Sequence, residues 1–226
     1  VSMALNVGID APVAFAERLG RLLATPIHVE NDVNAAALGA AAHFGTTSDL
    51  LLVSIGTGLA AGTVIGGRVV RGASGSAGEI GHIVIPGRAE ACRCGRRGCL
   101  EAVASGRSVV GRMAAAGISG GAVELWDAAE AGHVAARTIR DDVARAIAWA
   151  VSGACLLLDV ERIVLAGGVA SALGERFAAS IALAMRADAG ESAWLASARL
   201  ADRVVATPAG VELGAFGALR AARSAL

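Results

Sequence analysis

A short glycine-rich stretch, residues 78–101, carries four side chains of the kinds that bind metal ions. They follow the spacing H-x9-C-x-C-x4-C and are His82, Cys92, Cys94 and Cys99. A closed structural site for tetrahedral Zn²⁺ takes four nitrogen and sulfur ligands. Gly95 and Gly98 allow the backbone to fold tightly enough for three thiolates to converge. The stretch therefore predicts a structural zinc loop.

Disulfides or unrelated core thiols are the alternative to zinc. Cys92 and Cys94 are too close in sequence to pair comfortably with each other. No secretion signal opens the sequence, so a disulfide framework is a poor expectation, and a cysteine cluster then favours a metal site. Cys155 lies in an apolar run and is predicted to be an inert core residue.

Two carboxylates, Glu79 and Glu101, bracket the predicted zinc loop. A metal ion that holds both ends of the loop also fixes where these carboxylates point. We expect the loop to form one wall of a small-molecule site and to carry the contacts to a polyol.

A second candidate site is the sequence Glu-Asn-Asp-Val-Asn at 30–34, which joins a predicted strand at 27–29 to a helix. Folds of the α/β class place ligands at such junctions. Asn31 or Asp32 could simply cap the helix. Capping needs one such residue, and this junction has three besides Glu30. This favours a site role for Asp32, as a general base toward a hydroxyl group.

The turn Gly56-Thr57-Gly58 follows a predicted buried strand at 50–55. Its backbone N–H groups and hydroxyl suit a phosphate. It is not a dinucleotide-binding fingerprint, because a strand and not a helix follows it. A plain β-turn is an equally good interpretation.

A second glycine turn, Gly167-Gly168, lies between a predicted strand at 162–166 and a helix. A glycine pair in this position permits close approach of a flat or phosphorylated ligand. Tight packing of the strand against the helix explains the pair equally well.

Hydrophobic patterns predict an α/β chain around these residues. Strands are expected at 27–29, 50–55, 63–65, 68–71, 162–166 and 204–206. Helices are expected from Asp10-Pro12 to Pro26, then at 35–42, 100–116, 123–131, 133–158, 169–187 and 211–225, the last interrupted by Gly214 and Gly217. Three remaining large side chains are expected to be structural or at the surface: His28, Trp126 and His133.

Composition narrows the class of protein. The chain has 226 residues, is 55% hydrophobic and has a formal net charge of zero, which indicates a globular protein with one large or two small domains. Zero net charge argues against a dominant nucleic-acid surface. No apolar stretch is long enough to span a bilayer, and we expect a cytoplasmic location.

The ordered motifs Glu-Asn-Asp-x-Asn-Ala-Ala-Ala, Gly-Thr-Gly, Gly-Glu-Ile-Gly-His, Cys-x-Cys-Gly-x-x-Gly-Cys-x-Glu and Ala-Gly-Gly-Val resemble the ROK family of bacterial sugar kinases and sugar-responsive repressors. The resemblance implies an α/β actin-like ATPase (ribonuclease H-like) fold, with two domains around a cleft. Residues 1–43 would be a remnant of the small N-terminal domain, with the helix at 211–226 packed near it. Residues 44–210 would form the large C-terminal domain.

The resemblance also implies roles for individual residues. Asp32 matches the catalytic base, and the sugar hydroxyls would be bound by Asn31, Asp32, Glu79, His82 and Glu101. His82 would serve both the zinc and the sugar. The second phosphate loop would be Gly56, Thr57 and Gly58, and the adenosine-side turn would be Gly167 and Gly168. The expected cofactors are structural Zn²⁺ and, for a kinase, ATP with Mg²⁺; a homodimer is also expected.

Two departures from the family pattern affect the functional prediction. The first phosphate loop, Asp-x-Gly-x-Thr, is absent, and Ala60 stands where many relatives carry Gly. The sequence thus resembles an N-terminally truncated member, and we expect the 226-residue chain alone to have little or no kinase activity. The alternative to a sugar kinase is the sugar-sensing domain of a repressor, which would contact DNA only through a missing N-terminal helix-turn-helix.

Overall fold

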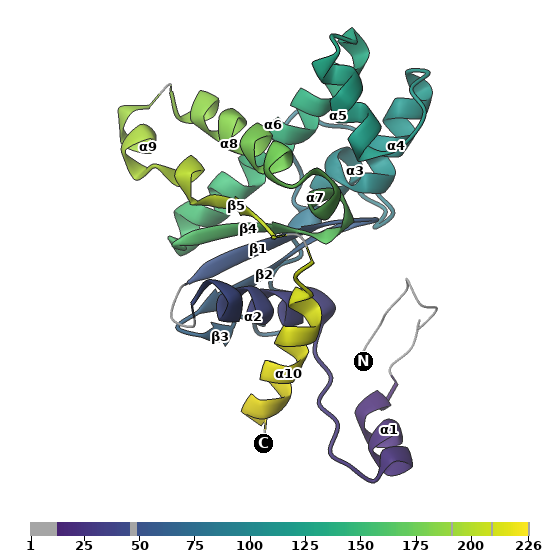
Figure 1. The fold of residues 1–226 in the computed structure, drawn as a ribbon, viewed down its shortest axis with the longest axis vertical. Helices are drawn as coiled ribbons and strands as arrows, with labels where there is room; N and C mark the ends of the chain where they lie inside the picture. Colours follow the sequence, from purple (N-terminus) through teal and green to yellow (C-terminus); the bar gives the residue numbers. More distant parts are fainter. Residues whose placement is uncertain (1–12, 46–48, 191, 209, 226) are drawn as a thin grey trace.

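A computed structural model of the protein describes residues 13–45, 49–190, 192–208 and 210–225. Within these ranges, five strands form one sheet in the order β3-β2-β1-β4-β5 (Figure 1). The strands are β1 Leu50–Ile55, β2 Leu59–Ile65, β3 Arg68–Val69, β4 Arg162–Ala166 and β5 Val204–Ala206. β1 pairs in parallel with β4 and antiparallel with β2, β2 pairs antiparallel with β3, and β4 pairs in parallel with β5.

Helices cover both faces of the sheet (Figure 1). One face carries α3 Leu100–Ala104, α4 Gly106–Ala115, α5 Ala122–Glu130, α6 Val134–Leu158, α7 Gly167–Leu173 and α8 Glu175–Ala189. The other face carries α2 Asp32–Phe44 and α10 Leu213–Ala225. The described chain also contains α1 Phe15–Leu23, α9 Ala193–Ala198 and the 3-10 helices η2 Ile80–His82 and η3 Leu200–Arg203.

The central strand β1 contributes to two separate hydrophobic cores. Successive side chains of a strand point to opposite faces of its sheet. Leu51 and Ile55 therefore pack among the helices on one face, whereas Leu50 and Leu52 pack with α2 and α10 on the other. The continuous apolar run predicted as a buried strand is thus explained by burial on both faces.

Glycine residues bring α2 and α10 into close contact. A Cβ atom at Gly217 would lie 1.5 Å from the carbonyl oxygen of Ala35, and one at Gly39 would lie 1.9 Å from that of Leu213. The prediction that Gly214 and Gly217 interrupt the last helix is wrong, because α10 is continuous. Gly217 is needed for helix packing instead.

The predicted strand at 27–29 is also wrong. These residues form neither helix nor strand, because no strand of the described chain pairs with them, and they connect α1 to α2. α1 extends away from the sheet (Figure 1) and buries none of its residues; Leu22 is 81% exposed. The predicted helix start at Asp10-Pro12 lies outside the described residues.

Most other predicted elements are confirmed within a few residues. Residues 162–166 and 204–206 are strands, and α6 matches the helix predicted at 133–158, with His133 as its N-cap. The helix predicted at 100–116 is divided at Ser105, whose side chain caps α4. The patterns missed α9 and η3. No helix in the described ranges combines the length and apolar character that a membrane span requires.

The division into residues 1–43 and 44–210 remains a prediction. In the structure, α2 packs on the same sheet as the helices of the larger unit, and α10 packs on α2.

Candidate functional site

The four predicted metal ligands converge. Their ligand atoms all lie within 4.8 Å of one another: His82, Cys92, Cys94 and Cys99. The Sγ atoms of Cys94 and Cys99 are 3.7 Å apart, and Sγ of Cys92 is 3.8 Å from Nδ1 of His82. Zinc–sulfur bonds of ~2.3 Å in a tetrahedron give sulfur–sulfur separations of ~3.8 Å. The donors present therefore fit a tetrahedral zinc ion.

Backbone hydrogen bonds shape the loop around this cluster. The N–H of Cys92 donates to the carbonyl of Arg96 at 2.8 Å, and the N–H of Gly95 donates to the carbonyl of Cys92 at 3.0 Å. Gly98 has a φ of +77°, and a Cβ atom there would lie 2.6 Å from the carbonyl oxygen of Arg88. A side chain at position 98 would thus disturb the turn that brings Cys99 back to the cluster.

The thiols of the cluster differ in acidity. Hydrogen bonds from the backbone N–H of Arg96 and from Cys92 lower the pKa of Cys94 to about 6. Burial, together with the neighbouring thiols, raises the pKa of Cys99 to about 11. The thiolate is the form of cysteine that binds a metal ion. Metal binding would therefore release the thiol proton of Cys99. Cys155 lies apart in the core, where burial raises its pKa to about 11.

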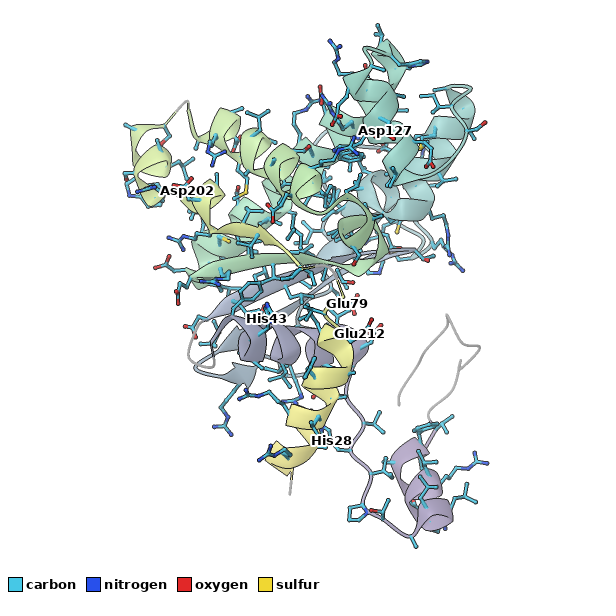
Figure 2. All side chains as sticks on the ribbon, in the orientation of Figure 1. His28, His43, Glu79, Asp127, Asp202 and Glu212 are labelled. Carbon is cyan, nitrogen blue, oxygen red and sulfur yellow. The ribbon has the colours of Figure 1, made fainter. Side chains whose placement is uncertain are left out.

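The segment Gly-Glu-Ile-Gly-His runs along the edge of β2. A Cβ atom at Gly78 or Gly81 would lie 2.0 Å from the carbonyl oxygen of Ala61 or Leu59, respectively. The N–H of Ala61 also donates to the carbonyl of Gly78 at 2.7 Å. Both glycines are therefore required for close backbone approach. They hold the segment of the exposed Glu79, labelled in Figure 2, against β2.

Glu101 connects the zinc loop to the Gly-Thr-Gly turn. It follows the predicted metal ligand Cys99 by two residues, and its Oε2 accepts a hydrogen bond from the N–H of Leu59 at 3.0 Å. A Cβ atom at Gly58 would lie 2.8 Å from the same oxygen. One carboxylate oxygen of Glu101 thus supports the turn, while the other is available to a ligand hydroxyl.

The two glycine turns, far apart in sequence, lie side by side. A Cβ atom at Gly56 would be 4.0 Å from the backbone nitrogen of Gly168. Gly167 has a φ of +86°, and a Cβ atom there would lie 2.6 Å from the carbonyl oxygen of Ile55. Gly167 therefore lets the start of α7 pack tightly against the end of β1, and both turns lie at the carboxyl ends of β1 and β4. The ligand role of the glycine pair stays a prediction.

Asp32 begins α2, but Asn31 is its cap. The side-chain oxygen of Asn31 accepts hydrogen bonds from the N–H groups of Val33 and Asn34, both at 3.0 Å. Asn31 thus offers a ligand its amide N–H₂ group. Asp32 is exposed, and its Oδ1 lies 2.9 Å from the nitrogen of Val33. It lines a cavity of ≈ 250 Å³ between the sheet, α7 and α10.

Hydroxyl groups that the motifs did not reveal also line this cavity. Ser54 lies near the end of β1, Thr207 follows β5, and Ser171 is in α7. Gly167 lines the same cavity. The sequence did offer one signal for Ser54 and Thr207. Each is a hydroxyl residue at the carboxyl end of a buried strand, where α/β sheets bind ligands.

The remaining predicted sugar contacts, Glu79, His82 and Glu101, do not line this cavity. Strand β2 connects the cavity residues to the segment that carries Glu79. A Cβ atom at Gly62 would lie 2.7 Å from the carbonyl oxygen of Val33, and Ala61, which precedes Gly62, contacts Gly78. Two adjacent residues of β2 thus touch the Asp32 junction and the Glu79 segment. The structure brings both groups to one end of the sheet.

An ion-pair network fastens the zinc loop to the helical layer. Asp142 in α6 accepts hydrogen bonds from Arg88 of the loop at 2.5 Å and from Arg112 of α4 at 2.6 Å. Its side chain is 19% exposed. Burial raises the pKa of Asp142, but the two arginines outweigh burial and hold it below the ordinary value of 3.8. The stabilisation is therefore present above that value and is lost as the pH falls through the lowered pKa.

We expect Asp142→Asn to lower the free energy of unfolding by about 2 kcal/mol at pH 7, since Arg88, Arg112 and Arg145 lose a charged partner. Urea unfolding of wild type and variant measures this difference, which should shrink as Asp142 becomes protonated in acid. Asp141→Asn is the matched control. Asp141 is adjacent in α6, and within the described residues its carboxylate pairs with the neighbouring Arg140. An equal effect in both variants would contradict a role for the network.

Comparison with known proteins supports the family resemblance. The ROK family model matches residues 2–223. A glucokinase of Halalkalibacterium halodurans is 35% identical over 190 residues, which are 75% of this chain and 56% of the relative. A putative xylose repressor of Caldicellulosiruptor sp. is 47% identical over 87 residues, 38% of this chain and 22% of the relative. The chain thus spans about half, or less, of the curated relatives it matches.

A solved ROK family glucokinase from Streptomyces griseus, in complex with glucose and AMPPNP, superposes with a TM-score of 0.76. It is 29% identical in sequence, and the match covers 96% of this chain and 74% of that one. The predicted α/β actin-like ATPase fold is confirmed. With the family model matching from residue 2 to residue 223, the chain belongs to the ROK family.

Proposed function

We propose that this chain is the sugar- and nucleotide-binding part of an ATP-dependent hexose kinase. The observation that carries the proposal is the cavity that Asp32 and Gly167 both line. A general base and a nucleotide-side turn on one cavity suit transfer of a phosphoryl group to a hydroxyl. The relatives support the same class, since they include proteins named glucokinase and N-acetylmannosamine kinase.

In this proposal Asp32 accepts the proton of the sugar hydroxyl that attacks the γ-phosphate of ATP. Asn31, Glu79, His82 and Glu101 orient the sugar through its other hydroxyls. Such positioning is the main protein contribution to phosphoryl transfer.

The nucleotide would be held at the opposite side of the site. The N–H groups and hydroxyl of Gly56-Thr57-Gly58 would bind phosphate, and Gly167 with Gly168 would lie against the adenosine. Mg²⁺ bound with ATP supplies charge neutralisation on the phosphates. A structural zinc ion would be held by His82, Cys92, Cys94 and Cys99, as their separations allow.

Sugar sensing in a repressor is the second candidate function. A local identity of 47% over 87 residues to a putative xylose repressor supports it. A sensor needs the sugar contacts but no turnover. The two functions therefore differ in phosphoryl transfer and not in sugar binding.

Calorimetric titration of the purified chain with a panel of hexoses and N-acetylated hexosamines tests the proposal. We expect one of them to bind with a Kd in the range of ~1 μM to 1 mM, which is typical of enzyme substrates. ADP release from Mg·ATP with that sugar, in the full protein that carries these residues, then separates kinase from sensor. Absence of binding to every sugar of the panel would contradict both functions.

Location and assembly belong to the same proposal. A kinase that uses ATP and has no disulfides suits the cytoplasm, and none of the four cysteines is in a disulfide in the structure. We also propose a homodimer formed through the larger domain; light scattering of the purified protein would test this.

A further inference from the structure

A nearly buried carboxylate lies directly beside the Asn31-Asp32 pair. The side chain of Glu30 is 7% exposed. Its Oε1 accepts hydrogen bonds from the N–H of Asn31 at 3.1 Å and from the side-chain amide of Asn34 at 3.3 Å. Glu30 thus binds the backbone just before Asp32 and the side chain of Asn34 just after it.

The other oxygen of Glu30 binds an arginine from a distant segment. Oε2 accepts from Nε of Arg71 at 3.1 Å and also from Nη2 of Arg71. His28 approaches the same oxygen at 3.7 Å. Arg71 follows β3 and begins the loop that leads to Glu79, and its carbonyl accepts from the N–H of Ala77 at 3.2 Å. The ion pair thus joins the segment carrying Asp32 to the loop carrying Glu79.

Electrostatic interactions at Glu30 favour the observed contact between the Asp32 segment and the loop that carries Glu79. Burial raises the pKa of Glu30, but hydrogen bonds from Arg71, Asn31 and Asn34 outweigh burial and place it below the ordinary value of 4.5. Glu30 is therefore ionised at neutral pH. A charged group with this little exposure is costly without its partner, so the pair resists movement of either segment.

We propose that the Glu30–Arg71 ion pair is a positioning device, which sets the spacing between Asp32 and Glu79. The inference rests on the proposed function, in which these two carboxylates act on one sugar. A misplacement of about 1 Å in a catalytic arrangement can cost ~100-fold in rate. Loss of the pair should therefore weaken sugar binding and turnover beyond its effect on stability.

Arg71→Gln tests the proposal, with Arg186→Gln as the matched control. Both arginines are about half exposed, at 50% and 57%, and each joins separate segments through one carboxylate. We expect Arg71→Gln to raise the hexose Kd by ~10-fold and to lower kcat in the full protein by ~10–100-fold. Arg186→Gln should leave both within ~2-fold. It should cost little melting temperature because its partner Asp202 is exposed, whereas Arg71→Gln should cost more because it leaves the nearly buried Glu30 unpaired.

Arg71→Lys and Glu30→Gln complete the test. The lysine variant keeps the charge and should recover most of the sugar affinity. Glu30→Gln should resemble Arg71→Gln, and the double variant should be no worse than either single one, because one interaction is removed in each case.

Three outcomes would overturn the inference. Unchanged hexose affinity and kcat in Arg71→Gln would do so, as would equal losses in Arg186→Gln. Effects of Glu30→Gln and Arg71→Gln that simply add would show two independent roles. If the wild-type protein neither binds nor phosphorylates a sugar, the proposed function itself fails, and the positioning role fails with it.

Discussion

Asp32→Asn is expected to lower kcat for sugar phosphorylation by ~10²–10⁴-fold, the range that general-base catalysis contributes. The amide cannot accept the hydroxyl proton, but it keeps the shape of the carboxylate. Helix α2 should remain intact because Asn31 and not Asp32 is its N-cap. Sugar affinity should therefore change by only a few fold. Coupled measurement of ADP release and calorimetry in the full protein would give both quantities.

The matched control for this prediction is Asp188→Asn. Asp188 is an exposed aspartate near the end of α8, away from the cavity residues. The same chemical change there should leave kcat and sugar affinity at the wild-type level. Undiminished turnover in Asp32→Asn would remove Asp32 from the role of base.

Cys94→Ser is expected to abolish stoichiometric zinc binding and to lower the free energy of unfolding by more than about 3 kcal/mol. The variant removes one of three thiolates from a site whose ligands come from both ends of a glycine-rich loop. The metal would add to the backbone hydrogen bonds and the Arg88–Asp142 ion pair that hold this largely exposed segment. Metal analysis and urea unfolding would measure the two effects.

Cys155→Ala is the control, since it removes a thiol outside the cluster. It should keep the zinc content and lose only the packing of one small buried side chain, about 1–2 kcal/mol. A chelator should destabilise the wild type and Cys155→Ala but not Cys94→Ser. Equal sensitivity to chelation in all three proteins would contradict the assignment of Cys94 as a ligand.

The metal-ligand cluster was predictable because ligand type and spacing are local properties. His82 and the three cysteines lie in one short segment, and glycines between them mark the turns. Strand β4 and helix α6 were predictable for a similar reason. A short run of β-branched and apolar residues fits a buried strand, and a long alanine-rich stretch fits a helix.

Features that depend on distant partners could not be predicted. The segment at 27–29 has the composition of a strand, but no strand lies beside it in the described structure. Gly217 has the character of a helix breaker, yet the backbone of α2 requires it.

The site shows the same limit. Ser54 and Thr207 belong to no motif. They line one cavity because β1, which contains Ser54, and β5, which Thr207 follows, both pair with β4. Glu30 and Arg71 are 41 residues apart, and nothing in either local pattern indicates that they pair. Pairings of this kind follow from the sheet order, which hydrophobic periodicity does not determine.

We expect one bound metal ion to organise the loop that presents Glu79, His82 and Glu101. X-ray absorption spectroscopy at the zinc edge, on freshly purified protein, tests it most directly. We predict one zinc ion per chain with three sulfur neighbours at ~2.3 Å and one nitrogen neighbour at ~2.0–2.1 Å. A protein without zinc, or with a first shell of oxygen and nitrogen alone, would contradict the account.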